Sequence, residues 1–165
     1  MTAADALAVE VTAPCPLWQR DCAEASALVE AAARLALRRA EAPAASVVDI
    51  TLADDAMQRG LNHAWRGKDA PTNVLAFPTA DLAVPLPDGA PLLLGDVVLA
   101  FETVRREAAE QQKPLADHMR HLVVHGVLHL LGYTHDDAAD AAAMEASEIA
   151  ILAELGVPNP YRDIM

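Results

Sequence analysis

The sequence predicts an α/β (α+β layered) fold in which one small mixed sheet of about four strands packs with about five helices. Short segments rich in β-branched residues alternate along the chain with longer segments whose apolar residues recur at helical spacing. The 165 residues are close to the commonest size of one domain, so we expect a single domain over residues 1–165. The longest stretch without Asp, Glu, Lys or Arg covers residues 121–135, which is too short and too polar for a transmembrane helix.

Four segments have the composition of strands. Residues 8–11 alternate apolar and polar side chains, and Pro14 and Pro16 end that segment. Runs of apolar and β-branched residues predict three further strands at residues 46–52, 74–77 and 92–100. The segment from Pro78 to Pro91 is rich in proline and predicts a loop, which could cover a cleft or serve only as a surface connection.

Five segments have helical periodicity, and most carry a start or stop signal. The expected helices cover residues 21–39, 54–65, 103–112, 114–131 and 136–155. Asp54 or Asp55 can cap the second helix, whose apolar face would hold Trp65 in the core. Asp136 or Asp137 can cap the last helix, and Gly156 and Pro158 end it.

The net charge of −12 argues against a protein that binds nucleic acid through a broad positive surface. Half of this charge lies in the last thirty residues, so the remainder of the chain is closer to neutral. Arg59, Arg66 and Lys68 fall in one short window without an acidic residue, and we expect them to form a local positive groove. Arg105 and Arg106 are flanked by acidic residues and fit a solvated helix face better than a phosphate contact.

The N-terminal segment and the cysteines favour a cytoplasmic protein with no membrane partner. Asp5 stands where a secretory signal would carry Lys or Arg, and no long apolar run follows it. The two cysteines, Cys15 and Cys22, form no Cys-x-x-Cys pair, so we expect reduced thiols.

Five of the six histidines lie between His118 and His135. On a helix, residues 118, 121, 125 and 129 share one face, while the opposite face is apolar, so we expect a buried helix with a stripe of imidazoles. His125 and His129 are spaced to ligate one ion, and Gly132 can turn the chain so that His135 supplies a third ligand. The sequence therefore predicts a zinc-hydrolase-like histidine helix in the core, with one Zn²⁺ ion per chain, although nickel, copper or iron would fit the same ligands.

This His-x-x-x-His-x-x-Gly-x-x-His spacing is that of metzincin-type zinc sites, with one difference. Gly126 occupies the position of the glutamate that serves those peptidases as general base. We therefore expect the metal but not peptidase activity. His121 would be a supporting or substrate-facing group rather than a fourth ligand, because four protein ligands would close the site, and His118 would be structural. The alternative is that the histidines only make hydrogen bonds in the core.

Three sequence blocks resemble the YbeY family of bacterial endoribonucleases and rRNA maturation factors. They are residues 121–135, residues 61–78 and residues 94–99, and the final helix adds Met144, Glu145 and Glu148. The resemblance covers roughly residues 48–156, and the blocks have the order and separation found in that family.

The resemblance implies a metal-dependent, single-strand-specific endoribonuclease that acts in 16S rRNA 3′-end maturation and ribosome quality control. It implies metal ligands at His125, His129 and His135 and a functional arginine at Arg66. The substrate would be a 16S rRNA precursor in the ribosome, with a ribosomal protein or an assembly GTPase as a possible partner. Arg59, Arg66 and Lys68 would contact this RNA. Trp65 and His63 could stack on a base, which is the alternative to the expected core position of Trp65.

Two positions depart from the family pattern. Thr134 and Asn73 stand where the family usually has Asp, and neither replacement removes a ligand. We group Thr134 with His121 among the residues that would orient the site or face substrate.

The residues leave two other functions open. A zinc peptidase would need another general base, and a metal-stabilised ribosome-assembly factor without catalysis would fit the low positive charge. No general base for RNA cleavage is identified: Asp136 and Asp137 follow a ligand, but they also stand where capping acids belong.

Overall fold

Four strands form one mixed sheet in the order β1-β2-β4-β3. The structure is a computed structural model that describes residues 7–79, 87 and 90–161. Strands β1 (Ala8–Thr12), β2 (Ser46–Ala53) and β4 (Leu92–Ala100) are parallel, and β3 (Val74–Pro78) runs antiparallel to β4. The expected α/β fold with a small mixed sheet is confirmed. Most of the proline-rich segment at residues 78–91, which was expected to be a loop, lies outside the described residues.

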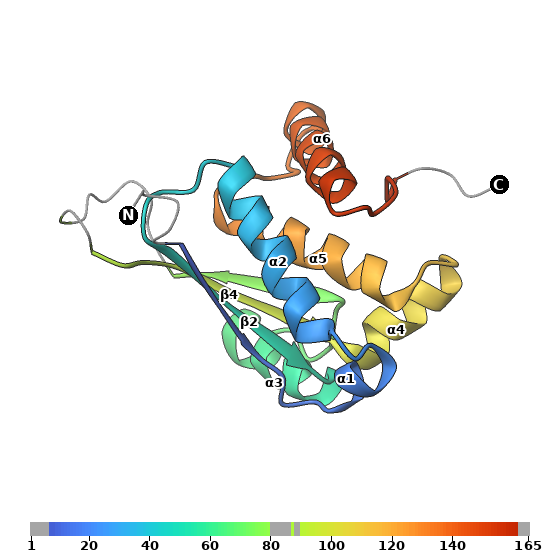
Figure 1. The fold of residues 1–165 in the computed structure, drawn as a ribbon. Coiled ribbons are helices and arrows are strands. Elements are labelled where there is room, and N and C mark those ends of the chain that lie inside the picture. Colours follow the sequence, from blue (N-terminus) through green and yellow to red (C-terminus); the bar gives the residue numbers. More distant parts are fainter. Residues whose placement is uncertain (1–6, 80–86, 88–89, 162–165) are drawn as a thin grey trace.

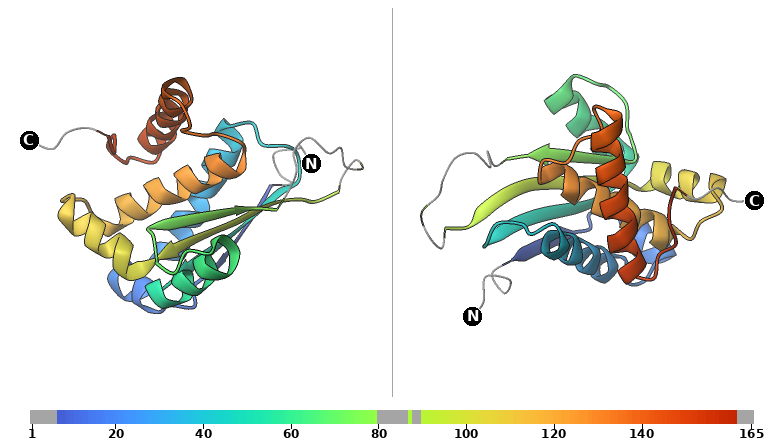
Figure 2. Two further views of the ribbon diagram at one scale, coloured as in Figure 1. Left: turned by 180° about the vertical axis from the view of Figure 1, so that it is seen from behind. Right: turned by 90° about the horizontal axis from the view of Figure 1, so that it is seen from above.

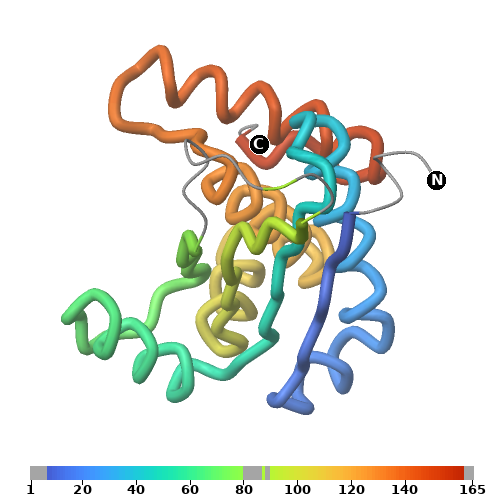
Figure 3. The backbone as a smooth tube through the Cα atoms, turned by 90° about the vertical axis from the view of Figure 1, so that its left-hand side faces the viewer, coloured from blue at the N-terminus to red at the C-terminus, as the bar shows by residue number. Residues whose placement is uncertain are grey.

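Helices cover both faces of the sheet (Figure 1). The described residues contain α1 (Leu17–Asp21), α2 (Ala25–Arg39), α3 (Asp55–Arg66), α4 (Phe101–Glu110), α5 (Leu115–Leu130) and α6 (Ala138–Glu154). Helices α2 and α5 lie side by side on one face, and α6 packs on them from outside the sheet, crossing α5 in Figure 2. Helix α3 lies on the opposite face of the sheet against β4, and its start contacts α4 (Figure 3).

The sequence did not predict α1 as a separate helix, and α2 begins at Ala25 rather than at Asp21. The burial of Trp18 explains why α1 forms. Its side chain is fully buried and packs edge-on against Phe101, with ring centroids 5.2 Å apart. Its Nε1 also donates a hydrogen bond to the Ala53 carbonyl oxygen over 2.8 Å. The buried tryptophan thus stabilises a helix of five residues. A helix this short has too few turns to show a periodic pattern of apolar residues in the sequence.

Helix α3 begins at the predicted cap but buries a different face. The Asp54 side chain accepts a hydrogen bond from the Met57 amide, as a capping residue does. Trp65, however, is 74% exposed, so its predicted core position is wrong. The buried residues of α3 are Gln58 and Asn62.

Backbone partners explain why polar residues replace Trp65 on the buried face of α3. The Gln58 amide donates to the Val98 carbonyl and accepts from the Thr72 amide, and Asn62 donates to the Ala70 carbonyl. Buried amides are tolerated when they are hydrogen-bonded in this way. Because the buried residues of α3 are polar, the spacing of its apolar residues does not indicate which face is buried.

Helix α5 crosses the core. Its buried apolar residues face the sheet and the helices beside it, as the sequence predicts. They are Met119, Leu122, Val123, Val124, Val127, Leu128 and Leu130. Within the described part of the chain, no helix is both long enough and apolar enough to cross a membrane.

Candidate active site

Helix α5 and the turn after it carry the three predicted ligand histidines, His125, His129 and His135. His125 and His129 project from the last turns of the helix, and their ring exposure is intermediate. Gly132 has φ of +101°, a left-handed conformation that glycine adopts readily, and it turns the chain back toward the helix. The His125 and His135 ring centroids are 6.0 Å apart. The structure thus brings together residues ten positions apart, as the spacing predicts.

The surroundings of His129 disfavour its protonation. Burial lowers the pKa of His129, and positive charge on His125, His135 and Arg66 lowers it further. Its Nδ1 atom is buried and has no hydrogen-bond partner among the residues that the structure describes. A neutral imidazole is the form that binds a metal ion, so the electrostatics of this position agree with the role of a ligand.

The residues present fit a zinc ion in their chemistry, because three imidazoles form a zinc donor set. In the described part of the chain, no three His, Cys, Asp or Glu side chains converge into a group that could hold a metal ion as they are placed. The assignment of His125, His129 and His135 as zinc ligands therefore stays a prediction.

A buried carboxylate that sequence reasoning did not assign to the site lies beside these rings. Glu148 on α6 is 1% exposed, and it accepts hydrogen bonds from His121 Nε2 (2.7 Å), Tyr161 Oη (2.8 Å) and His125 Nδ1 (3.3 Å). Burial alone would raise the pKa of Glu148, but these hydrogen bonds outweigh burial and hold it at about 2. The sequence pattern that could have identified Glu148 is an acidic residue at helical spacing between the buried apolar residues Met144 and Ile151 of α6.

Gly126 leaves no room for the general base of a peptidase. It is buried, and a Cβ atom built on it would lie 2.8 Å from Cγ1 and 3.2 Å from Cγ2 of Val97 on β4. The position that carries glutamate in metzincins therefore faces the sheet and not a substrate. A peptidase built on this helix would therefore need a general base from another position.

The three predicted RNA-contacting cations differ in their partners. Arg59 makes a two-point ion pair with Asp69, at 2.7 and 3.0 Å, so its charge is neutralised locally. Arg66 donates to the Ala76 carbonyl over 3.0 Å and lies over the Phe77 ring, 5.5 Å from its centroid. Within the described residues neither Arg66 nor exposed Lys68 forms an ion pair with a carboxylate. The exposed Trp65 lies beside Phe77, with ring centroids 6.3 Å apart.

The other predicted site residues make local contacts. Thr134 donates a hydrogen bond to the Asp140 carboxylate over 3.1 Å. Both residues line a pocket of about 410 Å³, which is bordered by the turn between His129 and His135. Asp137 caps α6 by accepting from the Asp140 amide over 2.7 Å, so capping is confirmed for Asp137.

The Glu107 carboxylate on α4 contacts two residues that the sequence analysis discussed: Asn73, before β3, and His118, near the start of α5. Each lies within hydrogen-bond distance of Glu107 Oε1, at 3.0 and 2.9 Å. His118 is buried, in keeping with the structural role that the sequence analysis gives it.

A family model described as "Endoribonuclease YbeY" matches residues 18–156 of the chain. The chain belongs to this family. A relative named "Endoribonuclease YbeY" from Paramagnetospirillum magneticum is 53% identical over 163 residues, covering 98% of both chains. Another of the same name from Rhodopseudomonas palustris is 47% identical over 157 residues, covering 94% of this chain and 91% of its own.

A solved structure shows a similar fold. It is the solution structure of a Thermotoga maritima protein, which matches with a TM-score of 0.55 at 20% identity over 94% of this chain and 96% of its own. The resemblance to the YbeY family predicted from the three sequence blocks is thus confirmed.

Proposed function

We propose that this protein is a zinc-dependent, single-strand-specific endoribonuclease that acts on a 16S rRNA precursor, in 3′-end maturation and ribosome quality control. The proposal rests chiefly on one observation: the charges of His125, His135 and Arg66 all act on the His129 ring, and Arg66 has no carboxylate partner in the described residues. The names of the relatives support RNA as the substrate. The cytoplasm is the expected location, with a ribosomal protein or an assembly GTPase as partner.

His125, His129 and His135 would hold the ion. Zinc, when bound to neutral imidazoles, keeps its positive charge and can polarise a phosphoryl oxygen or acidify a water molecule. Arg66 would bind the phosphate oxygens through its guanidinium and stabilise the negative charge that develops on them during cleavage. Its hydrogen bond to Ala76 and its contact with Phe77 orient the guanidinium before the substrate arrives.

Trp65 would supply a surface on which an unpaired base stacks. Its indole is exposed next to Arg66, and stacking on an aromatic ring is the usual way in which proteins hold single-stranded RNA. Arg59 contributes less to this surface than the sequence predicts, because Asp69 already pairs with it. Lys68 remains as a second cation near Arg66 along the chain.

A catalytically silent assembly factor is the second candidate. The net charge of −12 and the ion pair of Arg59 with Asp69 favour it, because both reduce the positive surface available to RNA. The two candidates differ in whether the purified protein, loaded with zinc, cuts RNA.

The first test compares zinc content and RNA cleavage of the wild type and His129→Ala. We expect the variant to lose most of its zinc, because two histidines form a poor site, and to lose cleavage of a single-stranded RNA. His63→Ala, which removes an exposed histidine on α3, should keep its zinc and serves as the matched control for metal content. Cleavage that survives in His129→Ala would come from a contaminating nuclease. A fully zinc-loaded wild type that does not cleave would favour the assembly factor.

The second test separates binding from cleavage at Arg66. Arg66→Ala should keep its zinc but lose about 100-fold or more in the rate of RNA cleavage, the scale seen when one donor to a transition-state oxyanion is removed. Binding of an uncleavable oligoribonucleotide can be followed through quenching of Trp65, since the other tryptophan, Trp18, is fully buried. An unchanged cleavage rate would remove Arg66 from the mechanism.

A further inference from the structure

Glu148 is a buried carboxylate without a cationic side chain to balance it. It is 1% exposed, and among the described residues no Lys or Arg pairs with it. Its hydrogen-bond partners are His121 and His125 on α5 and Tyr161 beyond α6. Burial of a carboxylate is unfavourable unless its oxygens are well satisfied, so this arrangement calls for an explanation beyond the packing of two helices.

We propose that Glu148 is a positioning residue that fixes the tautomer and the ring orientation of His125. An ionised carboxylate can only accept hydrogen bonds, so the contact with Oε2 places the proton of a neutral His125 ring on Nδ1. Nε2 then keeps its lone pair and is the nitrogen able to bind a metal ion. This inference rests on the zinc site of the proposed function, and it adds to that site a residue that does not itself touch the ion.

His121 and Tyr161 hold the other oxygen of the same carboxylate. They donate to Oε1 over 2.7 and 2.8 Å, and the His121 Nε2 and Tyr161 Oη atoms are 3.3 Å apart. The plane of the Glu148 carboxylate is therefore set by α5 and by the chain that follows α6. His121 thus supports His125 indirectly, by holding the carboxylate that contacts His125. This is how His121 would act as the supporting group that the sequence predicts.

A purely structural role makes a different prediction. If Glu148 only docks α6 onto α5, its replacement lowers stability and leaves the His125 tautomer and the zinc affinity of the folded protein unchanged. If Glu148 positions His125, the tautomer and the zinc affinity change even in a variant that is fully folded. Carboxylates that hydrogen-bond to metal-binding histidines commonly contribute 10- to 100-fold to metal affinity.

The test measures histidine tautomers and zinc affinity in the full chain. Nitrogen chemical shifts of the imidazoles, recorded by NMR on metal-free protein near neutral pH, should show His125 protonated on Nδ1. In Glu148→Gln the Nδ1-protonated fraction should fall, and the zinc dissociation constant from a competing chelator should rise about 10- to 100-fold. Glu145→Gln removes an exposed acid from the same helix and should change neither quantity.

Each outcome decides the assignment. An Nε2-protonated His125 in the wild type, or a folded Glu148→Gln with wild-type tautomer and zinc affinity, would overturn it. If Glu148→Gln does not fold, the wild-type tautomer alone gives the answer. A wild type that binds zinc and shows the Nδ1 tautomer but does not cleave RNA would refute the nuclease and leave the role of Glu148 intact.

Discussion

Gly126 limits which chemistry the histidine helix can perform. Its sequence position is that of a peptidase general base, yet in the fold it faces Val97 on the central part of the sheet. The absence of a side chain there allows α5 to approach β4 closely. A single residue thus removes the usual general base of one reaction class and sets the distance between two elements of the core.

Gly126→Ala should destabilise the protein despite the higher helix propensity of alanine. The new Cβ would lie 2.8 Å from a branched side chain that is itself fully buried, so Val97 or the helix must move. Overpacking of this kind typically costs about 1–3 kcal/mol in the free energy of unfolding, which denaturant titration measures.

Gly60→Ala is the matched control. Gly60 is exposed on α3, and nothing lies within 4 Å of the position that a Cβ atom would take there. That variant should gain up to about 1 kcal/mol from helix propensity. Equal stability changes in the two variants would show that Gly126 does not mark a close contact.

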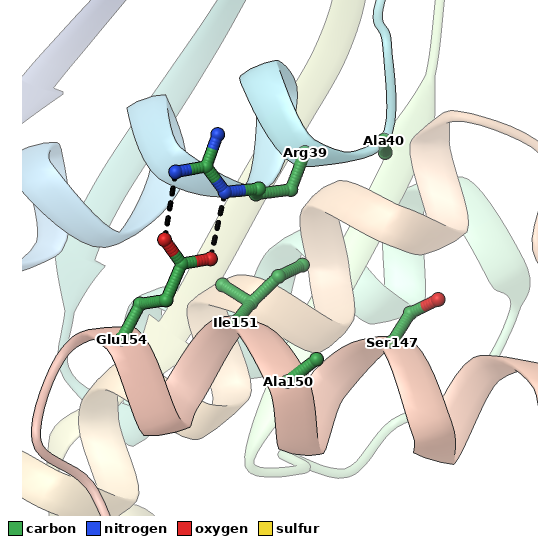
Figure 4. A pocket seen from close by; sticks show the side chains of 6 residues that line it. All are labelled: Arg39, Ala40, Ser147, Ala150, Ile151 and Glu154. Carbon is green, nitrogen blue, oxygen red and sulfur yellow. Dashed lines mark hydrogen bonds and ion pairs between the residues drawn. The ribbon is translucent and has the colours of Figure 1, made fainter.

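At the scale of elements, the docking of α6 combines an apolar contact with a surface ion pair (Figure 4). Arg39 at the end of α2 makes a two-point contact with Glu154 on α6, at 2.7 Å for both hydrogen bonds. Ile151 lies below this pair and is 3% exposed. Because Arg39 and Glu154 remain about half exposed, water screens their attraction.

The apolar contact should therefore dominate the docking of α6. Ile151→Ala should lower the free energy of unfolding by about 2–5 kcal/mol, whereas Arg39→Ala should lower it by no more than about 1 kcal/mol. Thermal or denaturant unfolding of the two variants measures both quantities. A larger loss in Arg39→Ala than in Ile151→Ala would reverse this ranking.

The sequence predicts elements better than it predicts the faces they bury. All four strands and the longer helices follow from apolar periodicity, prolines and capping acids, since these signals are local. The inward face of α3 could not be read, because it is built on polar residues: Gln58 bonds the Val98 carbonyl forty residues along the chain, and Asn62 bonds the Ala70 carbonyl after the helix. Glu148 was missed as a site residue for the same reason: its partners lie on α5 and near the C-terminal end of the described chain.

For the whole molecule, the candidate ligand histidines could be proposed from the sequence because they lie on one helix and the turn after it. Arg66 comes from another part of the chain: the charge pattern placed it in a positive window, and the family resemblance gave it a functional role. The tertiary fold brings Arg66 close enough to His129 to lower the pKa of that ring. The spacing of the histidines along the sequence thus indicates the candidate metal site. The position of Arg66, the candidate phosphate-binding group, depends instead on how β3 and α3 pack together.

The stability of the whole molecule should fall as the solution becomes acidic, and His118 should contribute to this fall. Burial lowers the pKa of His118 below its usual 6.5, with His121 and Lys113 adding to the shift and Glu107 opposing it. Nδ1 of His118 is buried without a partner, so protonation would bury an unpaired N–H donor. The unfolded chain therefore binds the proton more readily, and stability is lost as the pH falls below about 6.5.

His118→Gln should weaken this pH dependence, because glutamine can keep a hydrogen bond to Glu107 but does not titrate. Between pH 7.5 and 5.5, as a rough experimental window around the histidine pKa, the slope of unfolding free energy against pH should be shallower in the variant. One titrating group can change the slope by at most about 1.4 kcal/mol per pH unit. His129 also has a lowered pKa and is present in both proteins, so the difference between them isolates His118. Parallel slopes would mean that His118 binds its proton equally well in the folded and unfolded chains.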